Sequence, residues 1–272
     1  MPAIVYSTAD PAGKSIAKAL LASREFSFSE RHADYKMWAS DYNDAVLVEI
    51  DHPLISAEDL LIETDYLIFA SRHRSASGKP CFTVHPTGNW SGDAPLGGNA
   101  NELSYVQASA MKHAFLALSK LSAGNEIFQP TMEATHHGPT SLHHELFFIE
   151  LGSGEKEWAD MKAASIVAEA IMRAIDAERE KEFAIRAFGI GGTHYCSDFN
   201  KIELKSNIAM GHVLTGDRFD SAGDEMLQQA VEKGEAELII LDWKGLKAAQ
   251  RERAIKFAEG AGIKWKKDDE VK

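Results

Sequence analysis

Short runs of apolar residues recur along the chain, and most are separated by stretches whose apolar residues lie three or four positions apart. The runs at residues 3–6, 45–50, 66–70, 81–85, 146–151, 183–188 and 238–242 have the length of buried strands. Residues 130–135 are expected to end another strand. The runs at 45–50 and 66–70 are apolar almost throughout, as in strands covered on both faces.

Helical spacing fills the intervals between these runs. Pro11 suits the first turn of a helix, and apolar residues recur after it at positions 16, 17, 20 and 21. Further helices are expected at residues 102–121, 155–179, 223–233 and 247–259, with a frayed tail from residue 264. Strands and helices alternate without a flexible linker or a repeat. The pattern therefore predicts one α/β domain over residues 1–272, an α/β/α sandwich with a mixed, largely parallel sheet.

Histidines stand where several predicted strands end. His136 and His137 precede a turn that a Gly-Pro pair forces, His85 closes the strand at 81–85, and His194 follows a glycine-rich stretch. Sheets of this class gather strand ends along one edge, so these side chains are expected to converge. Neutral imidazole binds zinc, and histidine also transfers protons near neutral pH.

The paired histidines can be interpreted in two ways from the residues alone. On an extended chain adjacent side chains point to opposite faces, so His136 and His137 would not bind one ion unless the turn breaks that alternation. The sequence contains neither H-E-x-x-H nor C-x-x-C, so no standard zinc motif applies. A structural role and a functional site are equally consistent with this cluster.

Two polar loops carry further candidate groups. The loop at residues 71–79 could hold an anion with Arg72, His73, Arg74 and Lys79, although an ordinary solvated loop is an equal alternative. Residues 189–196 combine three glycines with Tyr195 and Cys196, and the glycines allow either a close backbone approach to a ligand or a sharp turn. Cys196 could be a nucleophile or a metal ligand, but a buried free thiol is the more common state of cysteine.

The charge balance limits the possible partners. With 29 Lys and Arg against 41 Asp and Glu, the net charge is −12, which argues against a general nucleic-acid-binding protein. Residues 244–267 carry eight Lys or Arg and two Glu, a stripe that suits a solvated helix face or a phosphate contact. No apolar run reaches the length of a membrane span and no leader is evident, so a cytoplasmic protein without a disulfide is expected.

Several motifs become specific when taken together. They are Glu133-Ala-Thr-His-His-Gly-Pro-Thr-Ser141, Gly191-Gly-Thr-His-Tyr195, Ser71-Arg-His-Arg-Ser75, Gly88-Asn-Trp90, Met111-Lys112 and Leu241-Asp-Trp-Lys-Gly-Leu246. The set resembles the archaeal and plant type of D-aminoacyl-tRNA deacylase over about residues 65–247. The chain departs from the family pattern at Ser197, where proline is expected, and at His143-His144, where the family varies.

The resemblance implies an enzyme that hydrolyses the ester between a D-amino acid and the terminal ribose of tRNA, releasing both. It also implies zinc as cofactor and a fold like those of peptidyl-tRNA hydrolases and nucleoside phosphorylases. The catalytic residues expected on this basis are Glu133, His136, His137 and His194, and the three histidines are the candidate zinc ligands. The expected substrate-binding residues are Arg72, His73, Arg74, Lys79, His85, Trp90, Thr140, Gly191, Gly192, Tyr195 and Lys244.

The expected partner is D-aminoacyl-tRNA, with no DNA and no membrane, and the expected assembly is a monomer or a small homo-oligomer. Local basic groups would meet the phosphates of the substrate in an otherwise acidic protein. A histidine base without metal is a variant of the same chemistry. The alternative functions are a zinc-dependent hydrolase or nucleoside-cleaving enzyme acting on a small substrate, and a non-catalytic RNA-binding module.

Overall fold

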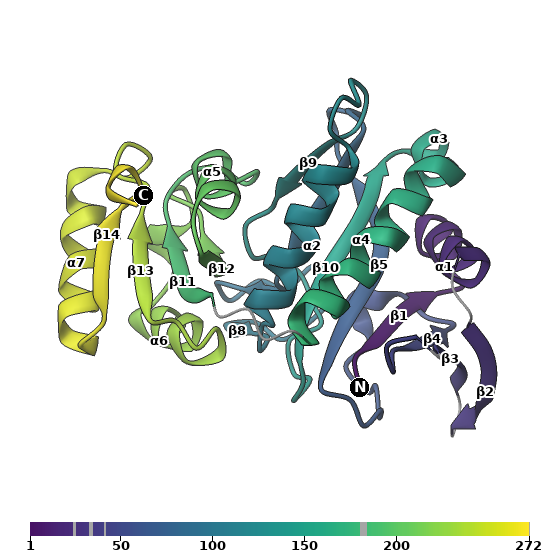
Figure 1. Cartoon of the computed structure of the whole chain (residues 1–272). Coiled ribbons are helices and arrows are strands. Elements are labelled where there is room, and N and C mark those ends of the chain that lie inside the picture. Colours follow the sequence, from purple (N-terminus) through teal and green to yellow (C-terminus); the bar gives the residue numbers. More distant parts are fainter. Residues whose placement is uncertain (24–25, 33–34, 41, 180–183, 272) are drawn as a thin grey trace.

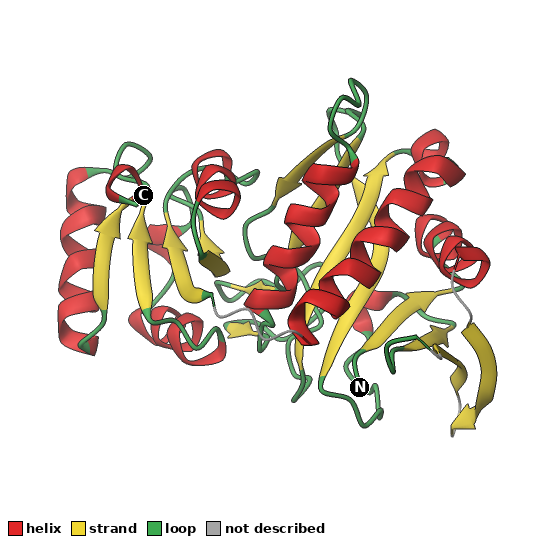
Figure 2. Ribbon diagram, in the orientation of Figure 1, coloured by secondary structure: helices red, strands yellow, loops and turns green. Residues whose placement is uncertain are grey.

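Two main sheets stand side by side in the computed structural model, which describes residues 1–23, 26–32, 35–40, 42–179 and 184–271 (Figures 1 and 2). The predicted α/β class with largely parallel strands is confirmed. The division of the strands between two sheets is new, because a hydrophobic pattern reports burial and not which strands pair. None of the helices in the described part of the chain has the length and hydrophobicity needed to cross a lipid bilayer.

The larger sheet has eight strands in the order β2-β3-β4-β1-β5-β10-β6-β9. Their bounds are β1 Ala3–Ser7, β2 Phe26–His32, β3 Tyr35–Ser40, β4 Val46–Ile50, β5 Tyr66–Arg74, β6 Cys81–His85, β9 Gln129–Met132 and β10 Glu145–Ser153. β4, β1, β5 and β10 are parallel to one another, whereas β6 runs antiparallel to β10 and pairs in parallel with β9. β6 therefore runs beside β10 in the direction opposite to β5, and its last residue, His85, lies opposite Phe148.

The central strands of the larger sheet, β1, β4, β5 and β10, are largely buried on both faces, as their apolar sequences predict. Helices α1 (Pro11–Ser23), α2 (Ala108–Leu121) and α4 (Met161–Arg179) pack together beside it, and their apolar side chains form one core with the sheet (Figure 1). On the other face the segment at residues 54–62, which includes the short 3-10 helix η1 (Leu54–Ser56), packs Leu54 and Leu60 against Phe69 and Phe148. This cover by a loop leaves room for clefts beside the ends of β5 and β6.

The smaller sheet is fully parallel, with four strands in the order β12-β11-β13-β14. Its elements are β11 Ile185–Ile190, α5 Ser197–Lys205, β12 Ile208–Leu214, η2 Phe219–Ser221, α6 Asp224–Lys233, β13 Leu238–Leu241, α7 Ala248–Ala261, β14 Lys264–Lys267 and η3 Asp268–Glu270. A short ladder of β7 (Gly88–Asn89) and β8 (Glu102–Leu103) also forms. Lys112 on α2 joins the two halves, because its buried Nζ donates to the Glu203 carboxylate at 3.1 Å and to the Ile208 carbonyl oxygen at 2.8 Å.

Several sequence-based boundaries were wrong. The tail expected to fray from residue 264 is β14, whose lysines flank Trp265 at the edge of the smaller sheet. The helix expected from residue 102 begins at Ala108, where the Gln107 side chain accepts the Ala110 N–H. The helix expected at 155–179 is broken into α3 (Glu155–Trp158) and α4, and β5 extends through residues 71–74, which were expected to be loop.

Two other differences concern segments without a clear pattern. β2, β3 and α5 were not predicted, since their sequences mix polar and apolar residues without a clean period. Residue 183, the expected start of a strand, lies outside the described residues, and β11 begins at Ile185.

Candidate active site

The paired histidines lie in a tight turn after β9. His137 adopts a left-handed backbone conformation with φ of 45°, and its carbonyl oxygen accepts the N–H of Gly88 at 2.7 Å. A Cβ on Gly138 would lie 2.3 Å from the backbone nitrogen of Gly98, so only glycine fits there. The turn breaks the alternation of an extended chain, and the ring centroids of His136 and His137 lie 4.4 Å apart. Both imidazoles therefore reach the same site.

His85 completes a group of three imidazoles. Its ring centroid lies 4.3 Å from that of His136 and 4.9 Å from that of His137. One ring nitrogen from each residue lies within 4.8 Å of the other two. In every ring Nδ1 is 2.6 to 3.2 Å from a backbone carbonyl oxygen one or two residues away in the chain. Because a carbonyl oxygen only accepts, Nδ1 carries the proton, and Nε2 of each neutral ring has a free lone pair.

The surroundings keep two of these rings neutral. Burial, together with the nearby His85, lowers the pKa of His136 well below its usual value and lowers the pKa of His137 to about 4. Burial also opposes the charged form of His85, but the Glu150 carboxylate, 3.6 Å from Nε2, outweighs it and raises the pKa of that ring. A proton and a metal ion would therefore compete for Nε2 of His85.

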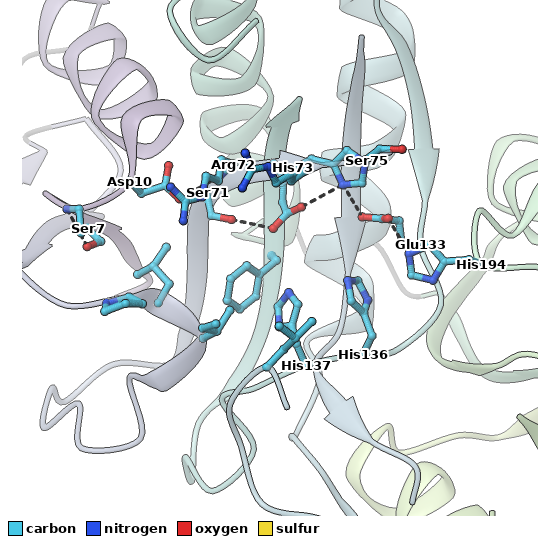
Figure 3. Close-up of a pocket in the computed structure, with 18 of the residues that line it drawn as sticks. Ser7, Asp10, Ser71, Arg72, His73, Ser75, Glu133, His136, His137 and His194 are labelled. Atoms are coloured by element: carbon cyan, nitrogen blue, oxygen red, sulfur yellow. Dashed lines mark hydrogen bonds and ion pairs between the residues drawn. The ribbon is translucent and has the colours of Figure 1, made fainter. Parts of the chain in front are cut away.

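A buried network of charges lies next to His136 and His137 (Figure 3). Nδ1 of His73, on β5, lies 3.2 Å from Glu133 and 3.4 Å from Glu150. Burial disfavours both carboxylate ions, but the histidines around them lower the pKa of Glu133 and of Glu150. Burial likewise opposes a charge on His73, and the contacts with Cys81 and the two carboxylates raise its pKa. One imidazolium therefore lies between two carboxylates.

His194 reaches the same network from the smaller sheet. It lies on the loop after β11, and its backbone carbonyl oxygen accepts the N–H of Ala134 at 2.8 Å. Nε2 of His194 lies 2.9 Å from the second oxygen of Glu133, while 46% of the side chain is exposed. Its ring centroid is 4.8 Å from that of His136. Glu133 thus connects a buried histidine, His73, with one that solvent can reach.

Tyr195 and Cys196, which follow His194, have different roles. The Tyr195 hydroxyl donates to Ser75 at 3.0 Å and lies 3.4 Å from Nε2 of His73. Cys196 is buried at the start of α5, and burial raises the pKa of its thiol. A thiolate is therefore disfavoured there, and Cys196 is a buried free thiol.

Two clefts meet at the histidines. The first cleft, of about 510 Å³, extends from the turn to the end of β5 and includes Asp10, Arg72, Arg74 and Tyr195 in its lining. The second cleft, of about 700 Å³, lies toward the smaller sheet and includes Trp90, Asp93, Gly192 and Asp217. Leu96, His136, His137 and His194 line both. The imidazoles therefore stand in the wall that the two clefts share.

A sequence model of the D-aminoacyl-tRNA deacylase family matches residues 61–266 of the chain. The chain belongs to the D-aminoacyl-tRNA deacylase family. The resemblance found in the motifs is thereby confirmed, and the match includes the histidine turn, Glu133 and His194.

Relatives of this name match along the whole chain. The D-aminoacyl-tRNA deacylase of Archaeoglobus fulgidus is 36% identical over 278 residues, which cover 100% of this chain and 98% of the relative. That of Pyrococcus abyssi is 34% identical over 285 residues, covering 98% and 100%. The crystal structure of a conserved protein of unknown function superposes with a TM-score of 0.93 at 36% identity, covering 100% of this chain and 96% of the other.

For this member of the deacylase family, the structure brings most of the predicted site residues to the two clefts. Those that line the first are Arg72, His73, Arg74, Glu133, His136, His137, His194 and Tyr195. Trp90 and Gly192 line the second, and Trp90 is held by a hydrogen bond from Nε1 to the Thr135 carbonyl oxygen at 3.1 Å. His85 is fully buried behind the paired histidines.

Besides His85, four residues predicted to bind substrate line neither cleft. Thr140 is buried, and its N–H donates to the carboxylate of Glu58 at 2.9 Å, so it shapes the turn. Gly191 packs against Asp242, where a Cβ would come within 3.0 Å. Lys79 and Lys244 are exposed on loops outside the clefts. Structural or more remote roles fit these four positions better.

The predicted trio of zinc ligands is divided between two groups. Among the described residues, ligand atoms cluster as His85, His136 and His137, and separately as Glu133, His136 and His194. His136 belongs to both groups, whereas His137 and His194 do not share one. In the group made of histidines alone, His85 therefore stands in place of the expected His194.

Glu150, Asp10 and Gly152 are site residues that the sequence analysis did not single out. Glu150 interrupts an apolar strand, and a charge in such a run was an available signal. Asp10 caps the start of α1 by accepting the Gly13 N–H at 2.7 Å. A Cβ on Gly152 would come within 2.7 Å of the Cβ of His73, so this glycine makes room for the imidazole. Only the folded structure reveals that contact.

Proposed function

We propose that this family member hydrolyses the ester of D-aminoacyl-tRNA at the wall between its two clefts. The substrate has two dissimilar parts, the amino acid and the terminal nucleoside, on either side of the bond to be broken. Two clefts that share His136, His137 and His194 in their linings would offer one compartment to each part, with the imidazoles beside the ester. This shared wall is the observation that carries the proposal.

The imidazoles of His85, which is buried, and of His136 and His137, which are half-buried, suit zinc. His85 Nε2 is buried without a hydrogen-bond partner within the described structure, and His136 and His137 are neutral at pH 7. Each ring donates Nδ1–H to a carbonyl oxygen, an arrangement that commonly orients zinc-binding histidines. His85, His136 and His137 would hold the ion. The chemistry that zinc supplies in such a site is Lewis-acid stabilisation of negative charge on an ester oxygen.

His194 is the general base in this proposal. When Nε2–H donates to Glu133, Nδ1 is left with a lone pair that can accept a proton from the attacking water. The Glu133 carboxylate then stabilises the imidazolium that forms. His73, already cationic between Glu133 and Glu150, keeps both groups ionised in a buried place. Proton transfer by His194 without metal is the variant that metal analysis has to exclude.

The family match does not favour the alternatives, which are an enzyme acting on a small nucleoside-like substrate and a non-catalytic RNA-binding module. We infer a cytoplasmic location, where aminoacyl-tRNA is made and used. The assembly expected, a monomer or a small homo-oligomer, stays a prediction.

Release of amino acid from D-tyrosyl-tRNA and L-tyrosyl-tRNA by the purified full chain tests the proposal. We expect hydrolysis of the D-ester, a loss of about a hundredfold or more in His194→Ala, and little change in His143→Ala, which lies outside both clefts. Equal rates in the wild type and in His194→Ala, with unchanged melting, would remove His194 from the chemistry. Absence of any D-tyrosyl-tRNA hydrolysis would overturn the function itself.

A further inference from the structure

A basic groove adjoins the first cleft on the outside of the molecule. It has a volume of about 700 Å³ and lies between α1, the end of β5, α3 and the start of α4. Four cationic side chains line it: Lys14, Lys18, Arg72 and Arg74. Arg72 and Arg74 line the first cleft as well, so the groove continues into the candidate active site.

The backbone fixes the two pairs of cations relative to each other. The Asp10 carboxylate accepts the N–H of Arg72 at 3.1 Å, which ties the start of α1 to β5. Gly13 lets α1 approach that strand closely, since a Cβ there would lie 2.7 Å from the Ala70 carbonyl oxygen. Lys14 and Lys18 are exposed four positions apart on the helix, so they project from one face toward solvent.

Trp158 orients both arginines. The guanidinium carbons of Arg72 and Arg74 lie 5.7 and 5.8 Å from the centroid of its ring, within the range of a cation–π contact. Trp158 is itself buried, and its Nε1 donates to the His73 carbonyl oxygen at 3.0 Å. A guanidinium held over a ring keeps its N–H groups available to donate to two oxygens of a phosphate group.

Among the residues that line the groove, Glu155 is the one acidic side chain against these four cations, and it is exposed. The Nε atom of Arg72 lies 3.9 Å from a carboxylate oxygen of Asp10. Over the ranges that the structure describes, no carboxylate lies within 4 Å of the charged groups of Lys14, Lys18 or Arg74. In a chain of net charge −12, such a cluster is a local site where a polyanion is attracted.

We propose that the basic groove binds the phosphate backbone of the acceptor strand of tRNA, next to its terminal nucleotide. This inference rests on the proposed function, and it names the surface that receives the RNA. The groove holds a short row of cations and leads into the cleft where the ester lies, as a strand entering from outside requires.

The basic stripe at residues 244–267, the other candidate from the sequence, is partly used within the protein. Arg253 donates to the Asp224 carboxylate at 2.7 Å and to the carbonyl oxygens of Phe219 and Ala222. Arg251 stacks on Trp243, with its guanidinium carbon 4.7 Å from the ring centroid. Arg253 is therefore a structural residue, and the stripe presents fewer free cations than its sequence suggests.

The groove also sets the direction of the substrate. A strand held by Lys14, Lys18 and the two arginines delivers its terminal nucleoside into the first cleft. The aminoacyl group then enters the second cleft, where Asp93 and Asp217 outnumber one cation, Arg218, and would attract its ammonium group.

The test measures two substrates with the full-length chain and with a double variant that combines Lys14→Glu and Lys18→Glu. We expect the KM for D-tyrosyl-tRNA to rise on the order of tenfold, with kcat within about twofold of the wild type. For 3′-O-D-tyrosyl-adenosine, which lacks the phosphate backbone, the rise in KM should be much smaller. Binding of deacylated tRNA should also depend less on salt in the double variant. The slope of log K against the logarithm of the salt concentration should fall in magnitude by about 1.4, that is, about 0.7 for each of two single-strand phosphate contacts.

Lys120→Glu with Lys205→Glu is the matched control, because both lysines are exposed and the change in net charge is the same. An equal effect of control and groove variants on KM and salt slope would overturn the proposal. The proposal would also be overturned if the double variant of Lys247→Glu and Lys256→Glu alone changed KM and the salt slope, because the contact would then belong to the basic stripe. If the wild type hydrolysed neither ester, the proposed function would fail, and the binding titration would still decide the groove.

Discussion

Replacing Glu133 with glutamine tests the most informative contact in the site. The carboxylate touches His73 through one oxygen and His194 through the other, at 3.2 and 2.9 Å. Glutamine keeps the size of the side chain and removes its charge. The variant should therefore leave the clefts in place while it weakens the support for a cationic His194 in the transition state.

The magnitude follows from the geometry. Two unit charges about 3 Å apart attract by roughly 5.5 kcal/mol at an effective dielectric constant of about 20. Because 46% of the His194 side chain is exposed, water screens part of this attraction, and about half of it is a reasonable expectation. A loss of about 2 to 3 kcal/mol from the transition state corresponds to a decrease of about 30- to 150-fold in kcat.

Single-turnover hydrolysis of D-tyrosyl-tRNA at saturating zinc measures this loss, and Glu150→Gln is the matched control. Glu150 also contacts His73, but its other histidine neighbour is His85 and no contact joins it to His194. If His85 binds zinc, Glu150→Gln should lower zinc affinity by about 10- to 100-fold, and its rate should recover as zinc is added. Glu133→Gln should not recover. A kcat for Glu133→Gln within threefold of the wild type, in a protein that melts normally, would refute the role given to His194.

Three further predictions concern the metal, the junction of the sheets and the pH dependence of stability. His85→Ala should lose bound zinc by metal analysis and lose activity with it, whereas full zinc content would remove His85 from the ligand set. Lys112→Met should lower the free energy of unfolding in urea by about 3 kcal/mol or more, because it leaves Glu203 buried without its cation. Burial raises the pKa of Glu203 to about 7, so the stability that it contributes is present below its unfolded value near pH 4.5 and is lost as pH rises through 7. Wild type should therefore lose about 3 kcal/mol more than Glu203→Gln between pH 4.5 and pH 8, and parallel urea profiles for the two proteins would contradict this.

Much of the order of strands and helices could be predicted from the sequence, because buried strands and helices show a periodic pattern of apolar residues. The strands at β1, β4, β5, β6 and β10 coincide with apolar runs, and α1 and α4 follow helical spacing. β14 was missed because an edge strand buries few side chains and therefore needs few apolar residues. Its Lys264, Lys266 and Lys267 protect an open edge and look like a solvated tail in the sequence.

The convergence of the histidines was predicted, but for a reason that the structure corrects. The strand ends were expected to meet along one edge of a parallel sheet. Instead, β6 runs antiparallel to β10, so His85 lies opposite Phe148 in the middle of that strand, and His194 arrives from the other sheet. Pairing partners depend on contacts between residues far apart in sequence, and periodicity carries no information about them.

The position of Glu150 explains why the site has to be built where the two sheets meet. A carboxylate in the middle of a buried strand is costly unless it is paired, and His73 and His85 on neighbouring strands pair it within the sheet. Glu133 then shares His73 and extends the same network to His194 on the smaller sheet. Through Glu133, the charge on the buried His73 is thereby linked to the orientation of His194, which solvent can reach. Lys112 joins the same two parts of the fold through Glu203 and Ile208, so the junction that carries this network is also held by a second buried charge pair.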